Sequence, residues 1–217
     1  MLPEWDGLRR PVAVIRCSVV VHGAKTCGWR HESRWRFFAD GSIEVAERAD
    51  PFGAMPSCLP RLGTSWRLSS ALEHLRWYGR GPFENYIDRK TAAFVGIWKS
   101  TVSEQYVEYE RPQDCGCKCD VRWAELADDG GRGVRFSADR PLFVQALHYT
   151  WEDLEFARHR GGQERIRNVP APRPEVFLNL DLGQCGLGGA SCGPHPMDKY
   201  LLPPKPESWT LRLEPLK

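Results

Sequence analysis

The sequence lacks any run of about 18 apolar residues, the length that a membrane-spanning helix requires. Its first residues, MLPEWDGLRR, also lack the apolar centre of a secretory signal peptide. We therefore expect a soluble chain that has no membrane partner and stays in the cytoplasm.

An excess of charge of either sign is also absent. The 30 Lys and Arg side chains nearly balance the 28 Asp and Glu side chains, which leaves a formal net charge of +2. Domains that bind nucleic acid normally carry a basic patch that neutralises phosphates. We therefore expect no nucleic-acid partner, whereas small neutral ligands are compatible with this charge.

Paired C-x2-C motifs, the usual ligands of a structural zinc ion, do not occur in the sequence. Eight cysteines are present, and Cys115, Cys117 and Cys119 form a C-x-C-x-C cluster that would need a fourth ligand to hold a soft metal ion. Without an export signal, an even number of cysteines is weak evidence for disulfides. We predict reduced, partly exposed cysteines and neither a metal nor another cofactor.

Helical periodicity is scarce, and most segments alternate apolar and polar residues as β-strands do. Residues 12–22 are rich in valine and isoleucine and predict a buried strand. Asp40 and Gly41 predict a hairpin turn, and residues 128–133 predict a second one. The other segments with strand-like patterns are 29–38, 43–49, 61–68, 72–78, 105–109, 121–125, 134–138, 142–149, 176–181 and 209–213.

One short helix is predicted at residues 151–159, because Thr150 and Asp153 have the spacing of a capping box. Many short strands, two hairpins and at most one helix favour an all-β, mainly antiparallel sandwich. We assign residues 12–217 to this domain and residues 1–11, which show no periodicity, to a tail or the stub of a longer chain. An incomplete sandwich exposes a sheet edge, so we also expect pairing with another chain, including a homo-oligomer.

The chain is organised around residues 77–93, which read WYGRGPFENYIDRKTAA. Gly81 and Pro82 end a strand there, because glycine adopts positive φ and proline has no amide hydrogen to donate. The tight loop that follows combines acceptors, donors and an opposite-charge pair at Glu84, Asn85, Tyr86, Asp88 and Arg89. We predict a structural loop that is locked by its own hydrogen bonds, since polar clusters are more often structural than catalytic.

This segment resembles the signature of the small-chain domain in the bacterial-type β-galactosidases of glycoside hydrolase family 2. Further pieces follow in the family's order: LPRLG at 59–63, PQDCGCKCDVRW at 112–123, HYTWEDLEFARH at 148–159 and VFLNLDLGQCGLGG at 176–189. The resemblance implies a large antiparallel two-sheet β-sandwich, or supersandwich, similar in shape to the galactose mutarotases. It also implies a C-terminal domain of an enzyme that hydrolyses terminal β-D-galactosyl residues.

The resemblance places the two catalytic glutamates on a separate (β/α)8 barrel, for which this chain has no room. The chain alone is therefore expected to be inactive, and its implied role is to cap the barrel and shape the aglycone subsite. Its implied partners are a β-galactoside and the rest of the β-galactosidase chain. Carboxylates within the chain are better interpreted as loop locks, caps or strand-end acceptors: Glu84, Glu152, Asp153, Glu175 and Asp181.

The family contributes one aromatic side chain to the sugar site, normally tryptophan, on the strand that ends in L-N-x-D. Asn179 and Asp181 match that motif, which puts Phe177 at the aromatic position. Phenylalanine keeps an apolar face for sugar C–H groups but has less area and no indole N–H, so weaker stacking is expected. Phe177, Asn179 and Asp181 are the predicted substrate-binding residues, and an ordinary core position is the alternative for Phe177.

Two other functions are compatible with the sequence. A free-standing carbohydrate-binding module would stack sugar on Phe177 together with Trp123 or Trp151. A mutarotase-like aldose epimerase would use His148 as an acid or base with a carboxylate opposite it. The residues that alternate with His148 and His74 favour satisfied core histidines instead, and no G-x-S-x-G motif supports nucleophilic catalysis.

Overall fold

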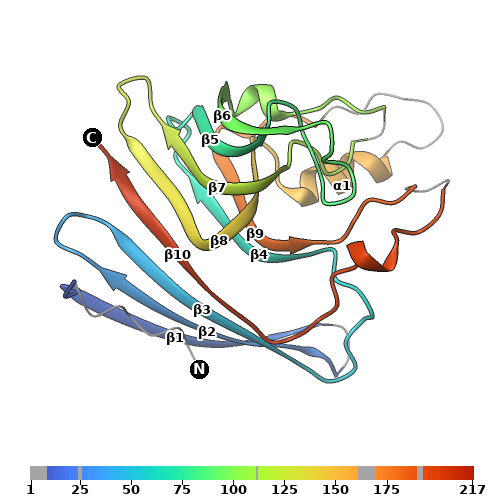
Figure 1. Cartoon of the computed structure of the whole chain (residues 1–217), viewed down its shortest axis with the longest axis horizontal. Coiled ribbons are helices and arrows are strands. Elements are labelled where there is room, and N and C mark those ends of the chain that lie inside the picture. The colour runs from blue at the N-terminus through green and yellow to red at the C-terminus, as the bar shows by residue number, and fades with distance from the viewer. Residues whose placement is uncertain (1–8, 24–25, 111, 161–169, 190–192) are drawn as a thin grey trace.

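A computed structural model describes residues 9–23, 26–110, 112–160, 170–189 and 193–217 (Figure 1). One α-helix, α1 (Trp151–Arg160), and two 3-10 turns, η1 (Ser103–Gln105) and η3 (Asp198–Tyr200), lie among these residues. No helix in this part of the chain is long and apolar enough to cross a membrane. The strands are β1 (Ala13–His22), β2 (Gly28–Phe37), β3 (Ile43–Phe52), β4 (Arg61–Leu68), β5 (His74–Gly81), β6 (Phe94–Thr101), β7 (Lys118–Ala127), β8 (Gly133–Leu147), β9 (Val176–Gln184) and β10 (Glu207–Leu216).

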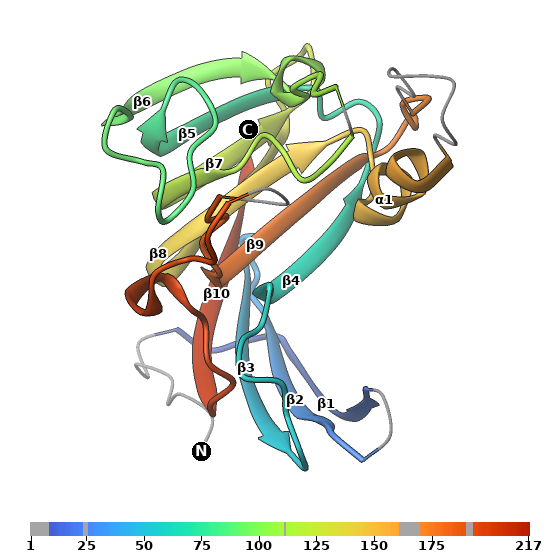
Figure 2. The same cartoon turned by 90° about the vertical axis from the view of Figure 1, so that its right-hand side faces the viewer.

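All strand pairs are antiparallel and belong to one hydrogen-bonded sheet in the order β1-β2-β3-β10-β8-β7-β5-β6. Strands β4 and β9 leave this path, because β9 pairs with both β4 and β8. The sheet curves so that β4 and β9 face the β2, β3 and β10 side across a common core (Figures 1 and 2). The predicted all-β, antiparallel sandwich is confirmed.

Strand β8 joins the two layers. Its first part pairs with β10, where Ala138 lies opposite Leu211, and its last part pairs with β9, where Phe143 lies opposite Asp181. Pro141 lies between the two pairings, where a residue without an amide hydrogen costs no ladder bond. The sequence predicted separate strands at 134–138 and 142–149, and the structure joins them into one long strand.

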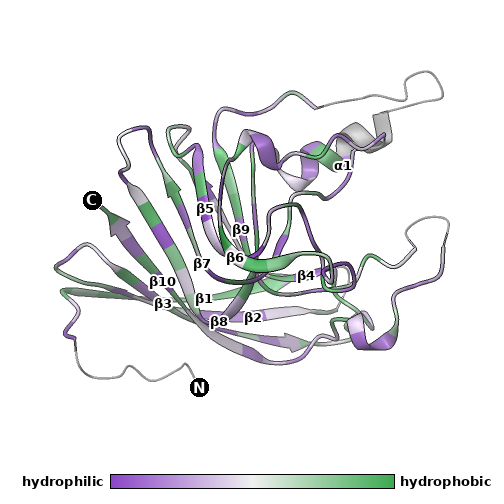
Figure 3. Ribbon diagram, turned by 45° about the horizontal axis from the view of Figure 1, so that its top comes forward, coloured by the Kyte–Doolittle hydropathy of each residue, from purple (hydrophilic) through white to green (hydrophobic). Residues whose placement is uncertain are grey.

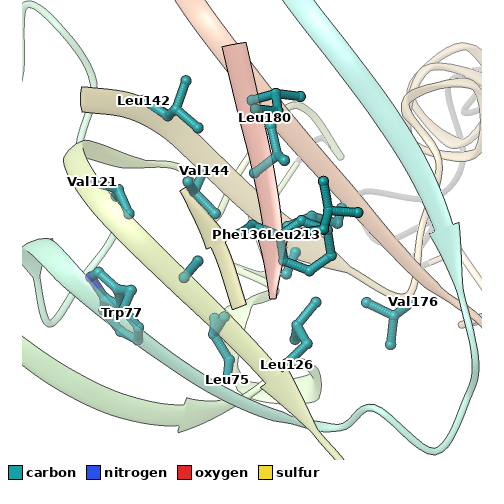
Figure 4. Packing of buried hydrophobic residues seen from close by; sticks show 14 of the residues in the cluster. Leu75, Trp77, Val121, Leu126, Phe136, Leu142, Val144, Val176, Leu180 and Leu213 are labelled. Atoms are coloured by element: carbon teal, nitrogen blue, oxygen red, sulfur yellow. The ribbon is translucent and has the colours of Figure 1, made fainter. Parts of the chain in front are cut away.

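The core lies between the layers, and hydrophobic and hydrophilic residues alternate along strands such as β10 (Figure 3). Figure 4 shows its members meeting from β5, β7, β8, β9 and β10, among them Trp77, Val121 and Leu180. Each of these side chains is at most 1% exposed. A core of this extent fixes the direction in which the alternate, polar residues of each strand point.

Both predicted hairpins and the helix cap are present. Gly41, with φ of 83°, lies in the turn between β2 and β3, and residues 128–133 join β7 to β8. The capping box is closed in both directions: the Thr150 amide donates to the Asp153 carboxylate at 2.9 Å, and the Asp153 amide donates to the Thr150 hydroxyl at 3.2 Å.

Two strand predictions were wrong. Residues 105–109 do not form a strand, because the Gln105 side chain donates to the Ser100 hydroxyl at 2.7 Å and the Thr101 carbonyl at 2.9 Å and starts an irregular segment. Strand β1 forms as predicted but is exposed along its whole length rather than buried. Residues 1–8 of the predicted tail lie outside the described residues, while the Arg9 guanidinium stacks on Phe38 at 4.5 Å.

Candidate functional site

The predicted substrate-binding residues lie on one face of β9, as strand alternation requires. The intervening side chains of β9 are buried in the core. Phe177, Asn179 and Asp181 therefore face away from the core. Phe177 and Asn179 have cross-strand neighbours on both β4 and β8 that point the same way, and Asp181 has one on β8. The three residues differ in what remains accessible, since their burial rises from Phe177 to Asp181.

Phe177 is half-buried at the rim of this face, near α1. The Arg173 guanidinium lies over its ring at 5.8 Å from the centroid. The Nε and Nη2 atoms of that guanidinium each donate to the Asp153 carboxylate at 2.7 Å, which lowers the pKa of Asp153. The helix cap thus positions the cation that borders Phe177, and the ring offers a partly exposed apolar surface next to a fixed positive charge.

Asn179 bridges the two strands that flank β9. Its amide nitrogen donates to the Gln145 side-chain oxygen on β8 at 2.8 Å, and its amide oxygen accepts from the Ser65 hydroxyl on β4 at 2.6 Å. Gln145 in turn donates to Asp114 at 2.7 Å and to the Cys115 carbonyl. Because both ends of the Asn179 amide have protein partners, this residue holds the face in shape.

Asp181 is 3% exposed and forms an ion pair with Arg61 at 3.0 Å. Its carboxylate also accepts from the Gln184 amide at 2.8 Å. Burial raises the pKa of Asp181, while the charge of Arg61 opposes that rise. Arg61, Ser65 and Gln145 complete this network and were not predicted as site residues. Their sequence signals were a polar side chain at alternate positions of predicted strands and, for Arg61, a place in the LPRLG motif at 59–63.

The loop at residues 81–90, which we call the locking loop, is held by bonds to other parts of the chain as well as by its own. The prediction of a loop locked by its own hydrogen bonds was therefore correct only in part. The Glu84 carboxylate accepts hydrogen bonds from the Gly116 amide at 2.8 Å, from the Tyr109 hydroxyl and from Arg89. The Arg89 guanidinium lies over the Tyr86 ring at 5.3 Å. The predicted opposite-charge pair therefore joins this loop to the irregular segment before β7.

Asn85 is completely buried and completes the same junction. Its amide nitrogen donates to the Phe83 carbonyl at 2.9 Å, its amide oxygen accepts from the Cys119 amide at 2.8 Å, and its backbone amide donates to the Cys117 carbonyl at 2.8 Å. Tyr86 packs beside it, 2% exposed, and burial raises the pKa of its hydroxyl. Every polar group of the Asn85 side chain is thus engaged in structure.

Asp88 links the locking loop to the glycine-rich segment that follows β9. Its carboxylate accepts from the Gly188 amide at 2.8 Å. A Cβ atom on Gly186 would lie 2.7 Å from an Asp88 carboxylate oxygen, so a side chain at position 186 would displace this contact. Asp88 therefore ties the locking loop to the segment that follows β9, at the end of the strand opposite to Phe177.

The cysteine cluster is buried, and the expectation of partly exposed thiols was wrong. Cys115, Cys117 and Cys119 are each 0% exposed and carry free thiols, because the segment packs under the locking loop. Burial raises the pKa of the Cys115 thiol to about 11 and lowers the pKa of the neighbouring Lys118 ammonium to about 8. Within the described residues no group of three His, Cys, Asp or Glu side chains is arranged to hold a metal ion.

The two histidines differ. His148 is satisfied: its Nε2 lies 2.7 Å from the Glu73 carboxylate, and its Nδ1 lies 3.0 Å from the Glu175 carbonyl. Direct pairing of His148 with Glu73 leaves no space for a sugar between an acid and a base. His74 is exposed and pairs with Asp129 at 2.8 Å, so its predicted core position was wrong.

The tryptophans considered for a sugar-binding surface do not adjoin Phe177 on one strand face. Trp123 lies opposite Ser137 near the start of β8, and the guanidinium groups of Arg76 and Arg135 lie over its ring. Phe177 lies opposite Leu147 at the other end of β8, roughly 30 Å along the strand at about 3.3 Å per residue. Trp151 is 63% exposed on α1.

Comparison with known proteins gives consistent matches. The family model described as the β-galactosidase small chain matches residues 7–213. The chain is 36% identical over 155 residues to a β-galactosidase of Priestia megaterium, covering 71% of this chain and 14% of the relative. It is 36% identical over 166 residues to β-galactosidase BgaC of Bifidobacterium adolescentis, and 33% identical over 193 residues to a β-galactosidase of an Arthrobacter strain. Those matches cover 75% and 84% of this chain but only 15% and 18% of the relatives.

Proposed function

The chain belongs to the β-galactosidase small-chain family, and from that premise we propose that it serves as the C-terminal domain of a glycoside hydrolase family 2 β-galactosidase. Its role in that enzyme is to cap the catalytic barrel and to border the aglycone subsite. The relatives named β-galactosidase support the enzyme context, and the chain's 14 to 18% share of their lengths supports a domain role.

The observation that carries the role in sugar binding is the position of Phe177. Its half-buried ring lies at the rim of the β9 face, with Asn179 and Asp181 fixed behind it by Ser65 and Arg61. We assign the direct sugar contact to Phe177 and the shaping of the surface to Asn179 and Asp181. An aromatic face stacks on sugar C–H groups, and a rigid backing reduces the entropy lost on binding.

Hydrolysis by the isolated chain is not expected, because most candidate carboxylates are engaged within the structure. Glu84, Asp153 and Glu175 pair with Arg89, Arg173 and Arg67, and Asp181 is buried against Arg61. A glycosidase needs two carboxyl groups that face each other across the substrate. In the proposed enzyme those groups come from the barrel domain.

The test uses a hybrid enzyme, in which this chain replaces the matching region of the Priestia megaterium β-galactosidase. With a chromogenic β-galactoside, the isolated chain should give no turnover and the hybrid should hydrolyse the substrate. Phe177→Ala in the hybrid should raise KM by roughly 3- to 10-fold, the equivalent of about 0.5 to 1.5 kcal/mol of lost stacking, and Phe177→Trp should lower it.

The matched control is Phe94→Ala, since Phe94 is 74% exposed on β6 and has no assigned role. It should leave both KM and kcat unchanged. Turnover by the isolated chain would refute the proposal, and so would a hybrid whose KM does not respond to Phe177→Ala.

A further inference from the structure

Strand β1 is an open sheet edge. Each of its ten residues is exposed, and within the described residues it pairs only with β2 (Figure 1). Natural edge strands are usually protected by charged side chains, proline or a bulge. β1 has a single charged side chain, Arg16, and neither a proline nor a bulge. Its exposed apolar side chains are Val14, Ile15, Val19, Val20 and Val21 at 44 to 55% exposure.

One face of β1 also continues the hydrophobic core without cover. In one row of paired residues across the sheet, Leu211 is 1% exposed and Val45 0%, Trp35 is half-buried, and Ile15 is 55% exposed. Trp66 on β4 contacts the Trp35 ring at 5.7 Å between centroids. The opposing layer thus reaches β2 but not β1, and the core face of β1 consists of Ala13, Ile15, Cys17, Val19 and Val21.

We propose that a β-stranded segment from the rest of the β-galactosidase polypeptide covers β1, pairing with its edge and packing on its core face. This inference rests on the proposed function, under which most of the enzyme lies outside this chain, as it does in the relatives. The added strand would satisfy the free backbone groups of β1, and apolar side chains would close the end of the core.

The opposite face of β1 adds an electrostatic requirement for the partner. Arg16 lies directly opposite Arg34 on β2, and like charges in that position destabilise a sheet. The Arg34 Nε atom is buried without a hydrogen-bond partner in the described part of the chain. The partner segment should therefore place Asp or Glu beside Arg16, on the face away from the core.

A second copy of this chain does not meet both requirements. Edge-to-edge pairing of two β1 strands about a two-fold axis extends the sheet but leaves both core faces uncovered, because each opposing layer stops at β2. Face-to-face packing covers the core faces and leaves both edges open. A partner must therefore bring both a strand that pairs with the β1 edge and a layer that covers its core face.

The experiment measures the reactivity of Cys17, an exposed thiol on the core face of β1. Iodoacetamide labelling is followed by mass spectrometry in the isolated chain and in the Priestia megaterium hybrid. Cys17 should react at least about tenfold more slowly in the hybrid, because labelling then requires local opening. Amide hydrogen exchange of β1 should slow in parallel.

Val19→Lys tests whether the protection comes from cover on this face. Val19 is 44% exposed in the isolated chain, so the variant should fold, yet in the hybrid it should restore fast labelling of Cys17. Val95→Lys is the matched control, since Val95 is also 44% exposed and lies on the other edge strand, β6. It should leave Cys17 protected.

The outcomes separate this inference from the proposed function. An active hybrid in which Cys17 reacts at the isolated rate overturns the inference and leaves the proposed function intact. Protection of Cys17 in a folded but inactive hybrid supports the inference and overturns the proposed function. Protection in the isolated chain that depends on its concentration, with a dimer in sedimentation, identifies a second copy and overturns the inference.

If the hybrid does not fold, the chain is instead expressed together with the Priestia megaterium enzyme truncated before the matching region. Copurification with Cys17 protected supports the inference, and labelling at the isolated rate or failure to associate overturns it.

Discussion

The locking loop and strand β1 relate to their surroundings in opposite ways. Asn85 in the locking loop is completely buried and satisfies its amide entirely within the chain. β1 is apolar but exposed along its whole length, with a free edge and an uncovered face. The sequence predicted a structural loop in the first region and a buried strand in the second. The structure holds the first within the chain, whereas the second is left uncovered.

The largest expected effect tests the locking loop. Asn85→Ala removes the acceptor of the buried Cys119 amide and the donor to the Phe83 carbonyl. Each buried group left unsatisfied costs about 1 to 3 kcal/mol, so the free energy of unfolding should fall by about 3 kcal/mol. Urea denaturation of the isolated chain measures this change.

The control for Asn85→Ala is Ser18→Ala, a polar-to-apolar change at an exposed position of β1. It should change the free energy of unfolding by no more than about 0.5 kcal/mol. Equal effects of the two substitutions would remove the contrast between the regions, because they would mean that Asn85 is no better integrated than an edge residue.

A smaller difference in unfolding free energy is expected between two substitutions in a single row of paired residues across the sheet. Val45→Ala removes two methyl groups from a site that is 0% exposed and should cost about 2 kcal/mol of unfolding free energy. Ile15→Ala, in the same row of paired residues but 55% exposed, should cost about 0.5 kcal/mol or less in the isolated chain.

The same two substitutions, Val45→Ala and Ile15→Ala, also test in the hybrid enzyme whether β1 is covered. If β1 is covered there, Ile15→Ala should become about as costly as Val45→Ala, since both side chains are then buried. A cost that stays small in the hybrid would show that β1 remains an exposed edge.

Local patterns predicted the fold wherever one interaction decided the outcome. Thr150 and Asp153 predicted the helix because a capping box forms between residues three positions apart. Asp40 and Gly41 predicted a hairpin because glycine readily adopts the positive φ that the turn has at Gly41. The exposure of β1 was not predictable from its sequence, since valine-rich strands have the same pattern whether or not another layer covers them. That cover depends on distant residues.

The candidate site was predicted in part for the same reason. Alternation correctly placed Phe177, Asn179 and Asp181 on one face of a strand. The partners that occupy Asn179 and Asp181 were not predictable, because Ser65 and Arg61 come from β4, more than a hundred residues earlier in the chain. Long-range pairing decides which polar side chains remain accessible, and a period of two residues carries no information on it.

The smallest expected effect concerns a half-buried ion pair beside strand β1. His31 on β2 lies opposite Val19, and its Nε2 atom is 3.2 Å from the Glu47 carboxylate, which is 2% exposed. The hydrogen bond to Glu47 raises the pKa of His31 above 6.5, against the effect of burial. Protonated His31 is therefore favoured in the folded state.

This raised pKa gives the stability a defined pH dependence. A histidine with a raised pKa in the folded state contributes stability that is fully present below about pH 6.5 and is lost as the pH rises through the folded pKa. His31→Gln should therefore cost more at pH 5.5 than at pH 8.5, by less than about 1 kcal/mol since the pair is partly solvated. Urea denaturation across this range measures it, with His74→Gln, whose partner Asp129 is fully exposed, as the control. If His31→Gln costs the same at both pH values, the His31–Glu47 pair contributes no charge-dependent stability beside β1. Apolar packing alone would then stabilise this part of the sheet.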